Sequence, residues 1–154
     1  MADIDVLKAP PQDLAAEQAV LGAIFLNSDR LIEVSEYLVA EDFYKTSHQI
    51  IFRIMTRLQD ERSPIDVLTV HTLLDNQGDL ETIGGISYIA ELAASTPTAA
   101  NAVFYAKIVS EKSLLRKLIR QLTDSVERAY SQDEPADDII AMAEKGIVAV
   151  TEGR

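Results

Sequence analysis

The stretch AVFYAKIVSEKSLLRKLIRQLTDSVERAY, residues 102–130, decides the fold. It contains neither proline nor glycine, and its apolar residues recur every three or four positions. This pattern predicts one continuous α-helix about 45 Å long, whereas an ordinary helix has about 11–12 residues. A helix of this length cannot bury its apolar side alone, so it must pack against something else.

At about 100° per residue, the apolar side chains of this helix gather within about 60° of one line. The basic residues Arg116, Lys117 and Arg120 lie on the other side, and Glu111 interrupts the apolar line. The line consists of Phe104, Ile108, Leu115, Leu118, Ile119, Leu122, Val126, Ala129 and Tyr130.

The segment YSQDEP, residues 130–135, predicts a turn in which Pro135 suits the first position of a new helix. That helix runs to about Val150 and spans only about 24 Å, roughly half the length of the long helix. Residues 99–150 therefore predict an antiparallel helical hairpin whose apolar line is only partly covered.

Two arrangements could cover the rest of the apolar line. It could pack within the same chain as one monomeric bundle, or two hairpins could pair about a two-fold axis as a four-helix bundle. We predict self-association. The residues expected to take part are Leu115, Leu118, Leu122, Ile139, Ile140, Ala143 and Ile147.

Residues 13–98 predict a compact head of five further helices, so the expected fold class is all-α. Asp13 is expected to cap the first helix, and Gly22 within it predicts close backbone packing. The other expected signals are a helix with Leu31, Val34 and Leu38, a capping box of Thr46 and Gln49, a helix from an Asp66 cap to Gly78, and a helix over 86–94. Residues 1–12 are expected to be a flexible segment and 151–154 the start of a linker.

The composition excludes several classes of protein. The chain has no cysteine, no run of about 18 apolar residues and no signal peptide, which predicts a cytoplasmic protein without disulfides or membrane spans. Its net charge of −11 makes tight non-specific DNA binding by this domain alone unfavourable.

No group of residues predicts catalysis, a metal site or a cofactor. His48 and His71 lie on different predicted helices, and Ser47 points about 100° away from His48, so structural or surface roles are expected for both histidines. Glu41 and Asp42 are expected to cap a helix, and Gly84–Gly85 to form a turn.

Five strings in fixed order go further than the periodicity. Together they resemble the N-terminal domain of bacterial replicative DNA helicases of the DnaB family, over about residues 10–150. The strings are PPQDLAAEQAVLGAIF (10–25), EDFYKTSHQIIF (41–52), PIDVLTV (64–70), IGGISYIAELA (83–93) and TAANAVFYAKIVSEKSLLRKLI (98–119).

The resemblance implies a collar domain that has no catalytic role of its own. In that family the hairpins pair, three dimers form a ring, and the collar receives the C-terminal domain of the DnaG-type primase, with a helicase loader as a further candidate partner. The sequence lacks the G-x-x-x-x-G-K-[ST] phosphate loop of the family's motor, so it resembles an excised domain that neither hydrolyses ATP nor unwinds DNA.

The resemblance also implies primase-docking residues, namely Tyr88, Ile119, Ser125 and Val126. Two alternatives stay open, because Tyr88 could be a core aromatic and Ile119 with Val126 could be buried in the hairpin or dimer seam. Many relatives carry an acid where this chain has Ala15, so that role is either unfilled or passes to Glu17.

A second hypothesis belongs to a different class of function. A helical accessory protein could bind DNA through the basic face of Arg116, Lys117 and Arg120 on the long helix. A solvated face, or one paired with acidic neighbours, is the alternative that involves no ligand.

Overall fold

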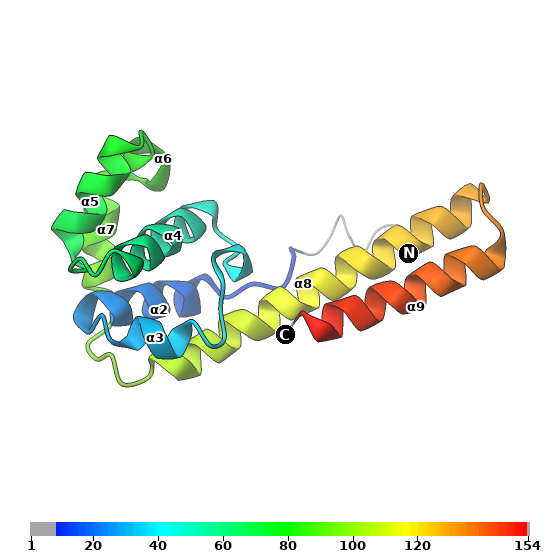
Figure 1. The fold of residues 1–154 in the computed structure, drawn as a ribbon, viewed down its shortest axis with the longest axis horizontal. Coiled ribbons are helices and arrows are strands. Elements are labelled where there is room, and N and C mark those ends of the chain that lie inside the picture. Colours follow the sequence, from blue (N-terminus) through cyan, green and yellow to red (C-terminus); the bar gives the residue numbers. More distant parts are fainter. Residues whose placement is uncertain (1–8, 154) are drawn as a thin grey trace. The chain divides into compact units, whose positions relative to one another are not determined.

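The computed structural model describes residues 9–153, and every regular element in this range is helical (Figure 1). The predicted all-α class is therefore confirmed. The elements are α2 (Leu14–Leu26), α3 (Arg30–Val34), the 3₁₀ helix η1 (Ala40–Asp42), α4 (Thr46–Asp60), α5 (Val67–Asn76), α6 (Leu80–Ile83), α7 (Gly85–Ala93), α8 (Ala102–Ser131) and α9 (Ala136–Glu152).

The chain divides into two compact units. The head is Gln12–Ser110, and the hairpin unit combines the described residues up to Pro11 with those from Glu111 onward, so α8 contributes to both. The division lies within α8, whereas the sequence interpretation placed it at residues 98 and 99. Most of the predicted flexible segment 1–12 and the last residue of the predicted linker 151–154 lie outside the described residues.

The core of the head is organised around α2, which packs most extensively on α7 and also contacts α3 and α4. Gly22 permits the close approach to α7. A Cβ atom at Gly22 would lie 2.7 Å from the carbonyl oxygen of Leu92 and 2.4 Å from Ser95 Oγ. The predicted close backbone packing at Gly22 is confirmed.

The predicted caps Asp13 and Asp66 are confirmed. The Asp13 carboxylate accepts a hydrogen bond from the Ala16 N–H at 2.9 Å, and the Asp66 carboxylate accepts one from the Thr69 N–H at 2.8 Å. The predicted capping box of Thr46 and Gln49 is wrong. Lys45 is the N-cap of α4 and makes no side-chain cap, while the Gln49 amide donates to the Phe43 carbonyl at 2.7 Å.

Other boundaries also differ from the prediction. α3 is only five residues long, and Leu38 reaches the core from beyond the turn that follows it, with 2% of its surface exposed. Pro135 is the N-cap of α9 and not its first helical residue. The short helices η1 and α6 were not predicted.

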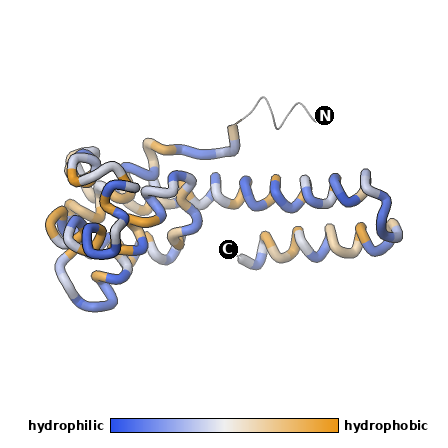
Figure 2. The backbone as a smooth tube through the Cα atoms, turned by 90° about the horizontal axis from the view of Figure 1, so that it is seen from above, coloured by the Kyte–Doolittle hydropathy of each residue, from blue (hydrophilic) through white to orange (hydrophobic). Residues whose placement is uncertain are grey.

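In the hairpin unit, α9 runs antiparallel to the second part of α8 (Figure 1). The connecting turn includes Gln132 in the left-handed region, with φ of 56°. The Arg128 guanidinium donates to the Glu134 carboxylate and to Met142 Sδ, and these contacts connect α8 to the turn and to α9. Figure 2 shows hydrophobic residues recurring between hydrophilic ones along α9. Within the described residues, no helix has both the length and the apolar character needed to cross a membrane.

Candidate functional site

Gln121 and Gly146 show which sides of α8 and α9 face each other. A Cβ atom at Gly146 would overlap the Gln121 side-chain amide, so the Gln121 side chain packs directly on α9 at this glycine. Ser125 and Arg128 lie one and two turns further along α8 on this same side. These three positions on the side of α8 that faces α9 are polar, whereas Leu118, one turn before Gln121, is a half-buried apolar residue on the same side.

The residue that follows Gln121 on α8 and the one that follows Gly146 on α9 are apolar and point away from the contact between the two helices. Leu122 and Ile147 follow Gln121 and Gly146, so each is turned by about 100° in the chain direction of its own helix. Because the helices are antiparallel, these two rotations bring Leu122 and Ile147 to the same face of the hairpin. Leu122 is 43% exposed and Ile147 is 42% exposed.

Helical spacing extends this face along both helices. We call it the hairpin strip, and it consists of Leu115, Ile119, Leu122 and Val126 of α8 with Ile140 and Ile147 of α9. All six are exposed. The other predicted self-association residues, Leu118, Ile139 and Ala143, are half-buried.

The predicted primase residues fall in both units. Ile119 and Val126 lie on the hairpin strip, beside the residues predicted for self-association. Ser125 lies on the side of α8 that faces α9, and its hydroxyl donates to the Gln121 carbonyl at 3.2 Å. Tyr88 belongs to the head, where it is half-buried.

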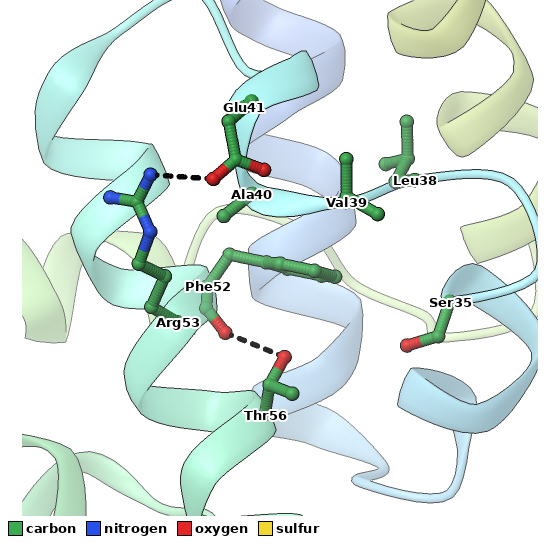
Figure 3. A pocket seen from close by; sticks show the side chains of 8 residues that line it. All are labelled: Ser35, Leu38, Val39, Ala40, Glu41, Phe52, Arg53 and Thr56. Carbon is green, nitrogen blue, oxygen red and sulfur yellow. Dashed lines mark hydrogen bonds and ion pairs between the residues drawn. The ribbon is translucent and has the colours of Figure 1, made fainter. Parts of the chain in front are cut away.

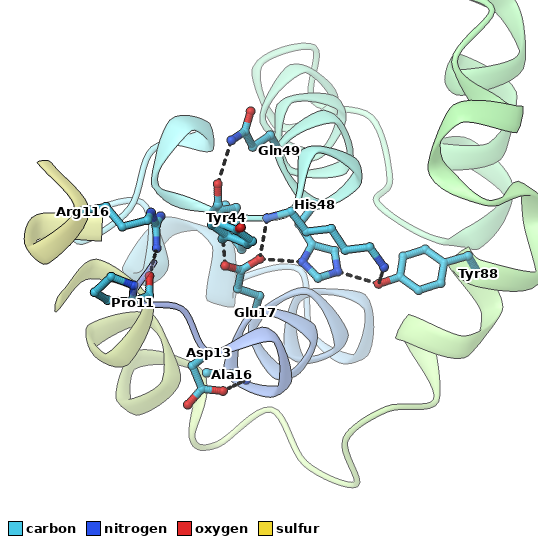
Figure 4. Close-up of polar contacts among 11 residues, drawn as sticks. Pro11, Asp13, Ala16, Glu17, Tyr44, His48, Gln49, Tyr88 and Arg116 are labelled. Atoms are coloured by element: carbon cyan, nitrogen blue, oxygen red, sulfur yellow. Dashed lines mark hydrogen bonds and ion pairs between the residues drawn. The ribbon is translucent and has the colours of Figure 1, made fainter. Parts of the chain in front are cut away.

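Tyr88 ends a buried chain of polar groups that connects α2, α4 and α7 (Figure 4). Glu17 is only 1% exposed, and its Oε1 lies 2.7 Å from His48 Nδ1. His48 is fully buried, and its Nε2 lies 2.5 Å from Tyr88 Oη. Lys45 Nζ lies 3.3 Å from the same phenol oxygen and 4.4 Å from the centre of the Tyr88 ring.

The hydrogen bonds of this buried chain of polar groups all point toward Glu17. A carboxylate only accepts, so His48 Nδ1–H donates to Glu17; in the neutral imidazole this leaves Nε2 as the acceptor for the Tyr88 hydroxyl proton. The Tyr88 oxygen in turn accepts from the Lys45 ammonium. Glu17 also accepts from the backbone N–H of Tyr44 at 2.7 Å and of Lys45 at 3.4 Å.

Sequence reasoning missed this arrangement. One signal was available: Glu17 is three, four and seven residues before Val20, Leu21 and Ile24, so it lies on the buried face of α2. The suggestion that Glu17 replaces an acid at position 15 on a docking surface is wrong, because Glu17 is buried while Ala15 is exposed. The structural role expected for His48 is confirmed.

Part of the basic face of α8 already makes contacts within this chain. Arg116 Nη1 donates to the Pro11 carbonyl at 2.8 Å, so this side chain holds the N-terminal segment. On the far part of α8, hydrogen bonds between Arg128 and Glu134 raise the pKa of the arginine and lower that of the glutamate. Nothing in this geometry adds support to the DNA-binding hypothesis.

Acidic residues near η1 have structural roles. Asp42 accepts from the Val39 N–H at 2.8 Å and so caps η1, while Glu41 makes no cap and pairs with Arg53 at 2.9 Å. This ion pair borders an open pocket of about 350 Å³ whose walls include Leu38 and Phe52 (Figure 3). Among the described residues, no cluster of histidine, aspartate and glutamate could hold a metal ion.

Comparison with known proteins assigns the fold to a family. The sequence model of the family DnaB-like helicase N-terminal domain matches residues 9–111 of this chain. The replicative DNA helicase DnaC of Bacillus subtilis (strain 168) is 47% identical over 152 residues, and the replicative DNA helicase DnaB of Geobacillus stearothermophilus is 44% identical over 152 residues. In both comparisons the alignment covers 99% of this chain and 34% of the relative, so the chain spans about a third of their length.

Solved structures agree with this assignment. The N-terminal domain of the DnaB helicase from Mycobacterium tuberculosis is 40% identical, with a TM-score of 0.87 over 92% of this chain and 99% of that one. A DnaB-like replicative helicase, described together with its interactions with primase, is 25% identical with a TM-score of 0.72. The match covers 92% of this chain and 34% of that structure.

Proposed function

The chain belongs to the DnaB-like helicase N-terminal domain family, and from this premise we propose that it is a non-catalytic collar module that self-associates through its hairpin and docks primase. The absence of a phosphate-loop motif from the sequence supports a role without ATP hydrolysis. The hairpin strip is the observation that carries the proposal.

The strip favours self-association on energetic grounds. Its six side chains are 39–56% exposed, and full burial of a leucine, isoleucine or valine contributes about 1.5–3 kcal/mol. A large part of this free energy is therefore gained only when another apolar surface covers the strip. A second copy supplies a matching surface, because a two-fold axis places the same strip on both partners.

A matched pair of substitutions tests self-association. Ile147→Asp places a charge on the strip, whereas Val148→Asp changes the next residue, which is 51% exposed but turned about 100° away from the strip. Light scattering across micromolar concentrations should give a reduced mass for Ile147→Asp and the parent mass for Val148→Asp. A strictly monomeric parent chain would refute this part of the proposal.

Primase docking rests on the family and on the exposed residues that match its pattern. A solved relative carries interactions with primase in its description, and Tyr88, Ile119 and Val126 present partly or fully exposed apolar surface here. Half-exposed aromatic side chains are frequent anchors in protein interfaces.

The docking test also has an internal control. Tyr37 is a second partly exposed tyrosine of the head, 38% exposed, with Lys107 Nζ 5.3 Å from its ring centre. Calorimetric titration with the primase C-terminal domain should show weaker binding for Tyr88→Ala and unchanged binding for Tyr37→Ala. Equal effects of the two substitutions, or no binding by the parent chain, would refute docking at Tyr88.

A further inference from the structure

We propose that His48, held by Glu17, is a positioning residue that fixes the Tyr88 side chain in the orientation used for docking. This inference rests on the proposed docking of primase at Tyr88. It assigns an effect on primase binding to Glu17 and His48, which are buried and so cannot touch primase themselves.

The Tyr88 ring packs partly against the hydrophobic core of the head, and the buried chain holds its polar end. Tyr88 lies in the first turn of α7, three residues after Gly85; Gly84 and Gly85 have φ values of 106° and 76°. The ring is half-buried, so one side is open to solvent. Loss of the polar partner would therefore remove a restraint on which rotamer the Tyr88 side chain adopts.

The buried chain restricts this freedom from two sides. The His48 ring is nearly parallel to the Tyr88 ring, at 10° with the centroids 5.9 Å apart, and its Nε2 lies 2.5 Å from the phenol oxygen, so the two rings meet edge to edge at this hydrogen bond. Lys45 lies over the same ring and reaches the phenol oxygen with its ammonium group. The direction and the rotation of the phenol are both defined.

Glu17 is needed because histidine can present either ring nitrogen as the acceptor. Its carboxylate accepts Nδ1–H and so selects the tautomer with the lone pair on Nε2. The backbone N–H groups of Tyr44 and Lys45 hold this carboxylate in place. Two buried residues, Glu17 on α2 and His48 on α4, thus determine the state of a partly exposed residue on α7.

The expected size of the effect follows from the ordering of one side chain. Immobilising a flexible interface side chain costs about 0.5–1.5 kcal/mol, which corresponds to a two- to twelvefold change in the dissociation constant. His48→Asn keeps a donor for Glu17 but is too short to reach Tyr88. It should weaken primase binding by about this factor.

A double-mutant cycle separates positioning from general damage. Tyr88→Phe keeps the ring but removes the phenol, so His48→Asn should have no further effect in that background. His48→Gln extends an amide oxygen toward the position of Nε2 and should restore binding to within about twofold of the parent. Ile51→Val, a buried change on α4 that leaves the Glu17–His48–Tyr88 hydrogen bonds in place, should leave binding unchanged.

The tautomer gives a readout that needs neither a partner nor a mutation. In ¹⁵N NMR of the full chain, His48 should carry its proton on Nδ1. Proton on Nε2 would overturn the inference, as would parent-like primase binding by a folded His48→Asn variant. If His48→Asn does not fold, Tyr88→Phe with the parent affinity would overturn it as well. Absence of primase binding by the parent chain would instead refute the proposed function, and the positioning role for docking with it.

Discussion

Gly22→Ala tests the packing that organises the head. The new methyl group would lie within 3 Å of two atoms of the segment that ends α7, the Leu92 carbonyl oxygen at 2.7 Å and Ser95 Oγ at 2.4 Å. The Ser95 hydroxyl could rotate away, but it would lose its hydrogen bonds to the carbonyls of Leu92 and Gln18. The Leu92 carbonyl belongs to the backbone and moves only if α2 and α7 separate.

The opposing contributions can be ranked. Overpacking of a close-packed core costs about 1–3 kcal/mol, and a lost hydrogen bond about 0.5–1.5 kcal/mol. Alanine in a helix gains about 0.5–1 kcal/mol over glycine. The steric cost is larger, so Gly22→Ala should lower the free energy of unfolding by about 2 kcal/mol, and the melting temperature by roughly 4–8 °C for a chain of this size.

Gly146→Ala provides the matched control, because it is also a glycine within a helix. Its methyl group would meet only the amide end of Gln121, a flexible side chain that can move aside. We therefore expect unchanged or slightly increased stability. Thermal and urea unfolding followed by far-UV circular dichroism would measure both variants. A Gly22→Ala variant as stable as the parent would refute the close approach of α2 and α7.

Three further predictions concern hydrogen bonds and charge. Glu17→Ala should lower the free energy of unfolding by about 3 kcal/mol or more, because three donors lose their buried acceptor at about 1–3 kcal/mol each. Glu17→Gln should lower it clearly less. Urea unfolding measures both variants, and equal losses of stability would contradict the role of the carboxylate. Asp66→Ala should cost about 1 kcal/mol through loss of the N-cap of α5, measured in the same way, and no loss would contradict the cap. Hydrogen bonds from Arg128 lower the pKa of Glu134 from its ordinary value of about 4.5, so this pair adds stability above that pH and loses it as the pH falls through the lower folded pKa. An NMR titration should show the Glu134 pKa rising in Arg128→Gln, and an unchanged pKa would contradict the pairing.

The helices were predictable where local chemistry alone determines them. Asp13 and Asp66 cap helices through bonds to residues three positions ahead, and α8 follows from an unbroken apolar periodicity. The helix predicted to include Leu38 ends earlier. Leu38 keeps the spacing expected of a helix, but it lies beyond a turn that brings its side chain back to the core. The prediction failed at Thr46 because Glu17, far away in sequence, supplies the acceptor for the backbone before α4.

The candidate sites divide in the same way. The apolar line of α8 followed from periodicity, but the edge that faces α9 depends on the close approach of Gln121 and Gly146, which periodicity does not determine. The Glu17–His48–Tyr88 chain joins residues 31 and 40 positions apart. No local pattern pairs such residues, although the burial of Glu17 on α2 could have been anticipated.

Ile119 connects the two proposed functions, because it is assigned to primase docking yet lies on the same strip as Leu115 and Leu122. In a two-fold dimer every substitution occurs twice, so Ile119→Asp would place two charges in one apolar interface. At about 1–3 kcal/mol for each buried polar group without a partner, the dimer should weaken by roughly 30-fold or more. We therefore expect Ile119→Asp to reduce both the mass in solution and the affinity for primase. Tyr88→Ala, in the head, should reduce the affinity alone. A variant at Ile119 that keeps its full mass but no longer binds primase would show that the strip of α8 serves the partner and not the second copy.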